Sequence, residues 1–399
     1  MDAETDEHEA APWARFLLAA ADLGAPARKV EAFARAVPPR HTLDSALYDT
    51  VVATSDVHAD FAKLLQIMAS AGLVELPAGH TGPYDPRVVT DSAWVADRTL
   101  FVVCGDLVDG RRGDGVVDDP RGSYELLLHC FLFNMRVRAR AAGSEVLFTV
   151  GNHDLHTVIK GDGALSHYVG ASALAFFGGG QRRAEALRPF YACSPYLLLA
   201  LGSPASPYEV VFVHGALRKG RQSLLERTLA VQRAVDAGGG LGPIRDERFT
   251  HEDHSSWRRE YTQPTRCAGN RDLADLGCRL VVVGHCTTHS YEALKGEWDA
   301  QCASKRGDAA AGTGAGCVLV TCTEPMIALV DTAMSGCFYR DAGLARARGL
   351  HVLLLTRGAG ERSTGTYAVG RALVGPSPML VVGDTGVPLA TPRGGGAYV

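Results

Sequence analysis

Five short β-rich runs, each ending in polar side chains, constrain this chain more than any other feature of its sequence. The runs are "DTVVATSDVHAD", "RTLFVVCGDLVDG", "EVLFTVGNHD", "YEVVFVHGAL" and "CRLVVVGHCTTH". Each starts as an apolar, β-branched stretch typical of a buried strand and then reaches Asp, His or Asn. A turn would explain the glycines and the asparagine, since both tolerate positive φ, but a turn does not select histidine repeatedly.

Segments with helical periodicity separate several of these runs. Residues 60–73 and 123–141 carry apolar side chains at i, i+3 and i+4 spacing. Strands bounded by helices predict an α/β fold in which helices cover the sheets. In open α/β architectures the carboxyl ends of the strands meet at one crevice, where ligands bind. We therefore expect polar residues that are far apart in the sequence to face one another.

A glycine precedes the polar residues at three of the five strand ends. Gly105, Gly151 and Gly284 each directly precede a polar residue, where the backbone is expected to bend sharply and to approach a neighbour closely. Each cluster alone has an ordinary explanation, such as an Asx-turn or a helix cap. Five clusters of similar composition favour a shared site. The polar residues are Asp56, His58, Asp106, Asp109, Asn152, His153, Asp154, His214 and His285.

The donor set at the strand ends has a common chemistry. Carboxylates, imidazoles and a carboxamide oxygen together suit divalent ions such as Mn, Fe or Zn. The set contains no thiolate, which argues against a structural zinc site. There are too many ligands for one ion with an open position, whereas two ions bridged by a shared carboxylate would use them all.

The order of these motifs resembles that of the calcineurin-like metallophosphoesterases. The D-x-H, G-D-x-x-D, G-N-H-[DE], strand-end His and final G-H motifs of that family correspond here to "SDVHAD", "CGDLVD", "VGNHDL", "FVHGAL" and "VVGHCTTH". The resemblance covers about residues 50–335. It is strongest to PPP-type and Shewanella-like protein phosphatases and their diadenosine tetraphosphatase relatives. It implies an α/β fold, a four-layer αββα metallophosphoesterase sandwich with two mixed β-sheets flanked by helices.

The resemblance also implies that two divalent metal ions, Mn²⁺, Fe²⁺/Fe³⁺ or Zn²⁺, are held by six of the strand-end residues. Asp106 would bridge the two ions. The other ligands would be Asp56 and His58 for the first ion and Asn152, His214 and His285 for the second.

The same resemblance implies a mechanism. A hydroxide between the two ions would attack phosphorus. His153 would bind no metal and would protonate the leaving oxygen as general acid, with Asp109 orienting it. Asp154 stands where PPP enzymes have Glu, and no sharp role is assigned to it.

The sequence departs from the family pattern at two places that concern ligands. His289 lies four residues after His285, so the role of the second histidine in G-H-x-H is not carried over to it. The residue after G-D-x-x-D, an arginine in PPP enzymes, is Gly110. Arg111 and Arg112 follow it, and either could bind phosphate from a shifted loop, with Arg111 taken as the candidate. The stretch "SSWRREYT" resembles the W-x-R stretch of Shewanella-like enzymes and makes Arg259 a second candidate, although a surface arginine beside a packing tryptophan is an open alternative.

The predicted function is metal-dependent hydrolysis of phosphomonoesters, either small phosphoesters or phosphoproteins at Ser, Thr or Tyr. A dinucleoside polyphosphate hydrolase or phosphodiesterase of the same fold is one alternative. A catalytically silent scaffold is another, but it predicts missing ligands, and none of the predicted positions is missing. The net charge of −4 gives no sign of a nucleic-acid partner.

The expected organisation has three parts. Residues 1–49 are predicted to form a helical N-terminal extension, 50–375 the metallophosphoesterase catalytic domain with a cap insert at 218–256, and 376–399 a flexible C-terminal tail. Arg182 and Arg183 follow a Gly-rich loop from which they could reach the site, but solvated charges are the favoured interpretation. No apolar run reaches the roughly 18 residues needed to span a bilayer, so no membrane partner is expected. The ten cysteines, scattered and without a CxxC pair, predict reduced thiols and a cytoplasmic location.

Overall fold

The structure is a computed structural model of the whole chain. The residues that it describes are 24–112, 115–219, 222–246, 258–259, 261, 271–286, 318–322, 325–332, 335, 350–357, 368–374 and 380–388. The predictions that concern His289 and Trp257 lie outside the described residues.

The first of two six-stranded sheets contains the first three predicted β-rich runs as parallel neighbours. Its strand order is β18-β17-β16-β2-β5-β8. The parallel strands are β2 (Thr50–Thr54), β5 (Thr99–Val103) and β8 (Glu145–Phe148). The antiparallel strands are β16 (Leu350–Thr356), β17 (Ala368–Val374) and β18 (Leu380–Pro388).

The second sheet contains the last two runs, again as parallel neighbours, in the strand order β1-β9-β10-β13-β15-β14. Its strands are β1 (Thr42–Asp44), β9 (Leu198–Ser203), β10 (Ser206–Val213), β13 (Leu280–Val283), β15 (Met326–Leu329) and β14 (Leu319–Thr321). Strands β9 and β14 pair antiparallel with their neighbours β10 and β15, so both sheets are mixed, as predicted.

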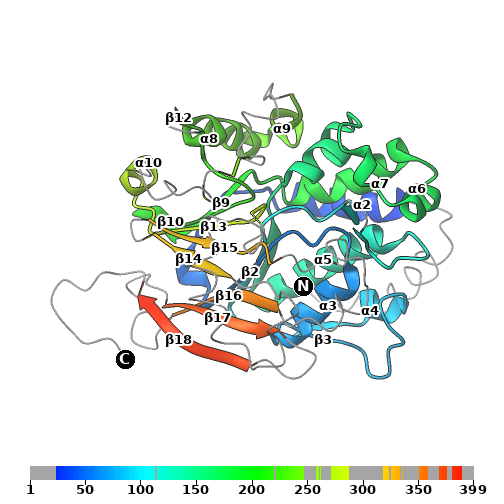
Figure 1. Cartoon of the computed structure of the whole chain (residues 1–399), viewed down its shortest axis with the longest axis horizontal. Helices are drawn as coiled ribbons and strands as arrows, with labels where there is room; N and C mark the ends of the chain where they lie inside the picture. Colours follow the sequence, from blue (N-terminus) through cyan, green and yellow to red (C-terminus); the bar gives the residue numbers. More distant parts are fainter. Residues whose placement is uncertain are drawn as a thin grey trace, which may run out of the picture.

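The two sheets pack face to face and are covered by helices on their outer faces (Figure 1). Successive side chains of β2 point to opposite faces of the first sheet. Val51 packs in the core between the two sheets, and Val52 packs in the core between the first sheet and its helices. The helices on the first sheet include α3 (Phe61–Ser70), α5 (Tyr124–Ala141) and α7 (Gly180–Cys193), and those on the second α8 (Leu225–Ala234) and α10 (Arg271–Asp275). This arrangement confirms the predicted four-layer αββα sandwich.

Short elements occupy the loops between these layers. They are η1 (Ser45–Leu47), β3 (Val74–Glu75), α4 (Pro86–Thr90), β4 (Ala93–Trp94), β6 (Arg111–Arg112), β7 (Gly115–Val116), η2 (Asp154–Lys160), η3 (Ser166–Tyr168), α6 (Ala171–Phe177), β11 (Arg218–Lys219), β12 (Gln222–Ser223), η4 (Val235–Gly239) and α9 (Gly242–Asp246). Two of them, η2 and η4, are π-helical.

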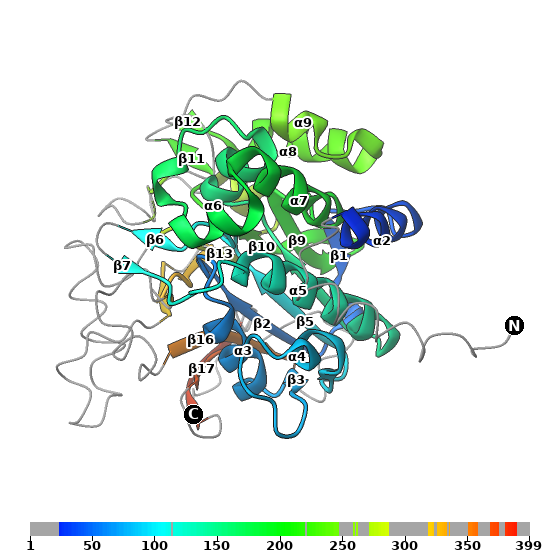
Figure 2. The same cartoon turned by 90° about the vertical axis from the view of Figure 1, so that its right-hand side faces the viewer.

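The two ends of the chain contribute more to the sheets than the sequence predicts. Helix α2 (Gly24–Ala36) packs beside α7 (Figure 2), and the ring of Phe33 contacts that of Phe133 edge to face at 5.4 Å between centroids. Strand β1 extends the second sheet from within the predicted N-terminal extension. Strand β18 lies within the predicted tail, where glycine and proline content did not suggest a strand. The division into extension, catalytic domain and tail stays a prediction.

Four of the cysteines that the structure describes agree with the prediction of reduced thiols, and one does not. Cys104, Cys130, Cys193 and Cys278 are buried thiols. Cys322 is disulfide-bonded, so the prediction of a reduced thiol was wrong there, because pairing depends on a short distance in space that sequence spacing does not report. Within the described ranges, no helix has the length and apolar character needed to cross a membrane.

Candidate metal site

The six predicted metal ligands come together from both sheets. Asp56, Asp106 and Asn152 follow strands β2, β5 and β8 of the first sheet. His214 and His285 follow β10 and β13 of the second. Direct contacts bridge the sheets, since the backbone N–H of His285 donates to Asp56 Oδ2 at 2.8 Å and His214 Nε2 lies 3.3 Å from Asp106 Oδ2. The polar residues at the strand ends therefore face one another, as expected from the sequence.

One group of potential metal-ligand atoms lies around the imidazole of His58. Its Nδ1 lies 3.1 Å from the carbonyl oxygen of Val108, and a proton on Nδ1 would be donated there. The other ring nitrogen, Nε2, then carries a lone pair and lies 3.7 Å from both Asp56 Oδ1 and Asp106 Oδ2. An imidazole nitrogen and two carboxylate oxygens within this distance could together hold a cation.

A second group surrounds the imidazole of His214. Its Nδ1 lies 2.8 Å from the carbonyl oxygen of Cys104. Its Nε2 lies 3.0 Å from Asn152 Oδ1, 3.2 Å from His285 Nδ1 and 3.3 Å from Asp106 Oδ2. These are all atoms that ligate borderline-hard divalent ions.

The electrostatics of the site favour positive charge. Burial, followed by the carboxylates of Asp331 and Asp106, raises the pKa of Asp56 well above its usual value. Burial opposes ionisation of Asp106, but the histidines around it, His214 first, hold its pKa well below the usual range. Burial also opposes a charge on His214, but Asp106 and Asp56 outweigh it and raise the pKa of His214 to about 9.

The residues fit a pair of divalent ions. Asp56 Oδ1 is buried and has no hydrogen-bond donor in the part of the chain that the structure describes, a costly arrangement that a cation would relieve. Two groups have ligand atoms within 4.8 Å of one another, one formed by His58, Asp106 and His153 and the other by Asp106, His214 and His285. Asp106 belongs to both groups, which is the position expected of a bridging ligand.

The backbone at the site is strained. Among the described non-glycine residues, positive φ angles occur at Asp56 (54°), His58 (44°), Asp106 (54°), Asp109 (68°) and His285 (57°), besides three residues to which no role is assigned. Such conformations cost on the order of 1–3 kcal/mol each and cluster at functional sites. The fold therefore holds these side chains in place against a local preference.

Glycines let the ligand loops approach closely, as the sequence predicts. A Cβ atom on Gly151 would collide with the carboxylate and backbone nitrogen of Asp106. A Cβ atom on Gly284 would collide with the hydroxyl of Ser55, which itself hydrogen-bonds to Asp56. Ser55 was not singled out from the sequence, because a serine before an aspartate is common in loops.

His153 lies beside the metal ligands and contacts Asp109. Its Nδ1 is 2.8 Å from Asp109 Oδ2, and both side chains are almost fully buried. The imidazole also meets the ring of His58 edge to face at 4.9 Å and that of Tyr168 at 5.0 Å between centroids. The structure thus brings together the two residues predicted to form the acid pair.

Comparison with known proteins agrees with this geometry. A family model described as calcineurin-like phosphoesterase matches residues 50–289. The chain belongs to this family. It is therefore a phosphoric ester hydrolase of a metal-dependent family, and the resemblance stated from the motifs is confirmed.

The relatives of this phosphoesterase are distant. Shewanella-like protein phosphatase 1 of Plasmodium berghei (strain Anka) is 21% identical over 282 residues, which are 65% of this chain and 70% of that protein. A cold-active protein-tyrosine phosphatase of a psychrophilic Shewanella species superposes with a TM-score of 0.51 at 16% identity, covering 84% of this chain and 82% of its own. A mutant of a cold-active protein tyrosine phosphatase gives 0.50 at 17%, with the same coverage. At these identities the structural likeness supports the fold.

Asp154 ties together the loops that carry the metal ligands of the phosphoesterase. Its Oδ2 accepts from the backbone N–H groups of Asp106 (2.8 Å) and Gly151 (2.9 Å). Its Oδ1 accepts from the backbone N–H of Leu107 at 3.0 Å and the hydroxyl of Tyr191 at 2.7 Å. Its place in the G-N-H-D motif was the only sequence signal for this role.

Arg183 is buried, so the prediction that it is a solvated charge was wrong. Its side chain is 1% exposed and contacts Asp109 and Glu125 behind the acid pair. No local pattern reports this burial, because it arises from packing of α7 against α5. The neighbouring Arg182 is exposed, as predicted.

The two candidate phosphate-binding arginines lie on exposed segments near the ligand loops. Arg111 is exposed and begins β6, two residues after Asp109. Arg259 is exposed, and the carbonyl of its neighbour Arg258 accepts from the backbone N–H of Ala216 at 2.9 Å, two residues after His214. Their role stays a prediction.

Proposed function

We propose that this phosphoesterase is a metal-dependent phosphatase that hydrolyses phosphomonoesters, with phosphoproteins as its substrates. The observation that carries the proposal is the place of Asp106, which belongs to both groups of potential metal ligands. Family membership supports phosphate ester hydrolysis, and the Plasmodium relative is named a protein phosphatase.

In this proposal Asp106 would serve both ions. Asp56 and His58 would complete the first set of ligands, and Asn152, His214 and His285 would complete the second. When bound, two divalent ions bind phosphoryl oxygens and lower the pKa of a water molecule, which makes it an effective nucleophile at neutral pH.

His153 and Asp109 act on the leaving group in this proposal. Asp109 Oδ2 would accept a hydrogen bond from His153 Nδ1–H, which fixes the orientation of the ring. As general acid the ring would act as an imidazolium, in which Nε2 also carries a proton; transfer of that proton to the leaving oxygen leaves a neutral imidazole and is worth roughly 10²–10⁴-fold in rate. Arg111 and Arg259 would pair with the phosphoryl oxygens, since a guanidinium matches them bidentately.

The test compares turnover of p-nitrophenyl phosphate with Mn²⁺ by the wild type and by Asp106→Asn. We expect activity that depends on the metal, and a loss of at least about 100-fold in the variant, because a neutral amide cannot bridge two cations. No metal-dependent turnover by the wild type with Mn²⁺, Fe²⁺ or Zn²⁺ would favour a catalytically silent scaffold.

A substrate panel separates the proposed substrate class from the same-fold alternatives. Phosphopeptides carrying Ser, Thr or Tyr phosphate, diadenosine tetraphosphate and bis-p-nitrophenyl phosphate would be compared by kcat/KM. Preference for the phosphopeptides supports the proposal. Preference for the dinucleotide or the diester would assign the chain to the polyphosphate hydrolases or phosphodiesterases instead.

A further inference from the structure

A buried ion pair lies directly behind the acid pair. Arg183 of α7 is 2.6 Å from Asp109 Oδ1 through Nη2. The same guanidinium forms a fork with Glu125 of α5, through Nε at 2.5 Å and Nη2 at 2.8 Å. Arg183 and Glu125 are each 1% exposed, and Asp109 is fully buried.

These contacts hold Asp109 at three points. Its Oδ2 lies against His153 and its Oδ1 against Arg183. Its backbone N–H donates to Glu125 Oε1 at 2.9 Å, which restrains a residue whose φ is +68°. The carboxylate cannot turn about its Cβ–Cγ bond without breaking a charge-assisted hydrogen bond in a buried place.

A buried ion pair is by itself weak evidence of a role in stability. Replacing such a pair by apolar groups of similar volume is often neutral or stabilising. The position of Asp109, in contrast, decides where the imidazole of His153 points. Arg183 binds Oδ1 of Asp109, the carboxylate oxygen that does not contact His153. A residue in this place affects the general acid by holding the carboxylate that orients it.

We propose that Arg183 and Glu125 are positioning residues for the general acid, and that they act by fixing the carboxylate of Asp109. This inference rests on the proposed function. Neither residue touches the substrate or the metal ligands through any contact described above. Their loss should therefore affect mainly the step in which the leaving oxygen takes up a proton.

The test uses the metal-loaded enzyme and a series of aryl phosphates with different leaving groups. Arg183→Met alone would leave Glu125 as an unpaired buried charge and destabilise the fold, so Arg183→Met is combined with Glu125→Gln. The glutamine keeps an oxygen for the backbone N–H of Asp109. We expect kcat on phenyl phosphate to fall by about 10- to 100-fold, as for other residues that orient a reactive group. On 2,4-dinitrophenyl phosphate, whose leaving group departs without a proton, the loss should stay below about threefold.

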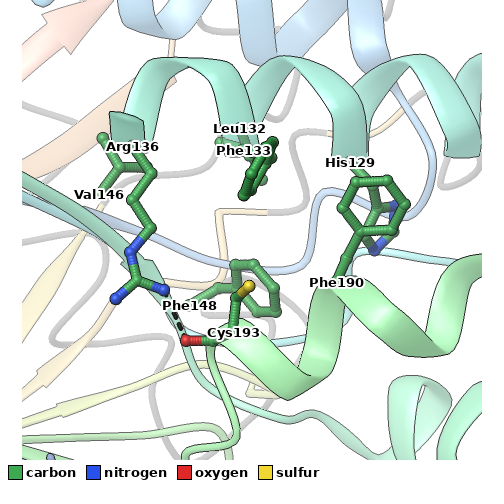
Figure 3. A pocket seen from close by; sticks show the side chains of 8 residues that line it. All are labelled: His129, Leu132, Phe133, Arg136, Val146, Phe148, Phe190 and Cys193. Atoms are coloured by element: carbon green, nitrogen blue, oxygen red, sulfur yellow. Dashed lines mark hydrogen bonds between the residues drawn. The ribbon is translucent and has the colours of Figure 1, made fainter. Parts of the chain in front are cut away.

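A control is available on α5, the helix that carries Glu125. Arg136 of α5 lies in the pocket drawn in Figure 3, is also buried and pairs with Glu145 at 2.9 Å, but contacts neither Asp109 nor His153 in the described structure. The double variant Arg136→Met with Glu145→Gln likewise removes a buried ion pair, one in which Glu145 also pairs with Arg140. It should leave the dependence of kcat on the leaving group as in the wild type.

His153→Ala separates the two proposals. If it loses activity equally on all the aryl phosphates, the general-acid role in the proposed function is wrong. If it loses activity selectively on phenyl phosphate but the Arg183–Glu125 double variant loses activity equally on all of them, or not at all, the positioning role is wrong. Introducing the double variant into His153→Ala should cause no further loss on phenyl phosphate, because the two changes act on one step.

Discussion

At the residue scale, Gly151 leaves no room for a side chain between the two loops that carry Asn152 and Asp106. A methyl group on Gly151 would push against the carboxylate and the backbone nitrogen of Asp106. We expect Gly151→Ala to reduce Mn²⁺-dependent kcat/KM by about 100-fold, since small displacements of a reacting centre have effects of this size. Steady-state kinetics and Mn²⁺ titration calorimetry would measure the loss.

Gly242 at the start of α9 is the control for this substitution. A Cβ atom there would meet nothing within 4 Å, so Gly242→Ala should keep the Mn²⁺ affinity and kcat/KM of the wild type. Wild-type Mn²⁺ affinity and turnover in Gly151→Ala would mean that the close approach of these loops does not set the position of Asp106.

At the scale of elements, the packing of α5 against α7 includes a histidine that the fold keeps neutral. His129 is fully buried among Phe148, Phe190 and Tyr191. Burial lowers its pKa from 6.5 to about 4. The unfolded chain therefore binds a proton at this residue between about pH 4 and pH 6.5, where the folded chain does not.

Because the pKa of His129 is lower in the folded state than in the unfolded state, the folded state should become less stable as the pH falls. The contribution of a neutral His129 to the free energy of unfolding is present above pH 6.5 and is lost as the pH falls toward 4. The difference of 6.5 − 4 in pKa corresponds to about 3 kcal/mol. Urea unfolding with a chelator present would measure the free energy of unfolding of both proteins at pH 7 and pH 4. Between these pH values it should fall by about 3 kcal/mol more in the wild type than in His129→Phe. Parallel pH profiles of the two proteins would show that His129 is not the group responsible.

The elements that carry the site could be predicted because their sequence signals are local. An apolar β-rich run followed at once by Asp or His identifies both the strand and the ligand at its end, as at Asp106 and His214. The role of Arg183 could not be predicted, because a charged residue in a polar helix gives no sign of burial. Strands β1 and β18 were missed for a related reason, since short or glycine-containing strands are defined by the partner that they pair with.

Residue roles that depend on distances across the fold were also beyond the sequence. The four hydrogen bonds of Asp154 reach two different loops and α7, and only the structure shows these partners. The disulfide at Cys322 likewise depends on a distance in space that the sequence does not report. The sequence therefore predicts which residues meet at the strand ends, whereas the buried contacts behind them require the coordinates.

At the scale of the whole molecule, the proposed metal ligands connect the two sheets. Asp56, Asp106 and Asn152 belong to the first sheet, and His214 and His285 to the second. Ions bound by both sets would cross-link the sheets at one edge of the sandwich, in addition to the apolar core between them. Ligands that bind only the folded state stabilise it by about 2.7 kcal/mol at a free concentration of about 100 times Kd.

We therefore expect Mn²⁺ to raise the Tm of the wild type and a chelator to lower it, while Asp106→Asn should show little change with either. Amide hydrogen exchange should locate the effect. Removal of the metal should speed exchange at the ends of β2 and β5 and also at the ends of β10 and β13, because the cross-link joins both sheets, but not in α8 on the outer face. Faster exchange in one sheet alone would place the ions within that sheet, and an equal rise in Tm for Asp106→Asn would place them away from Asp106.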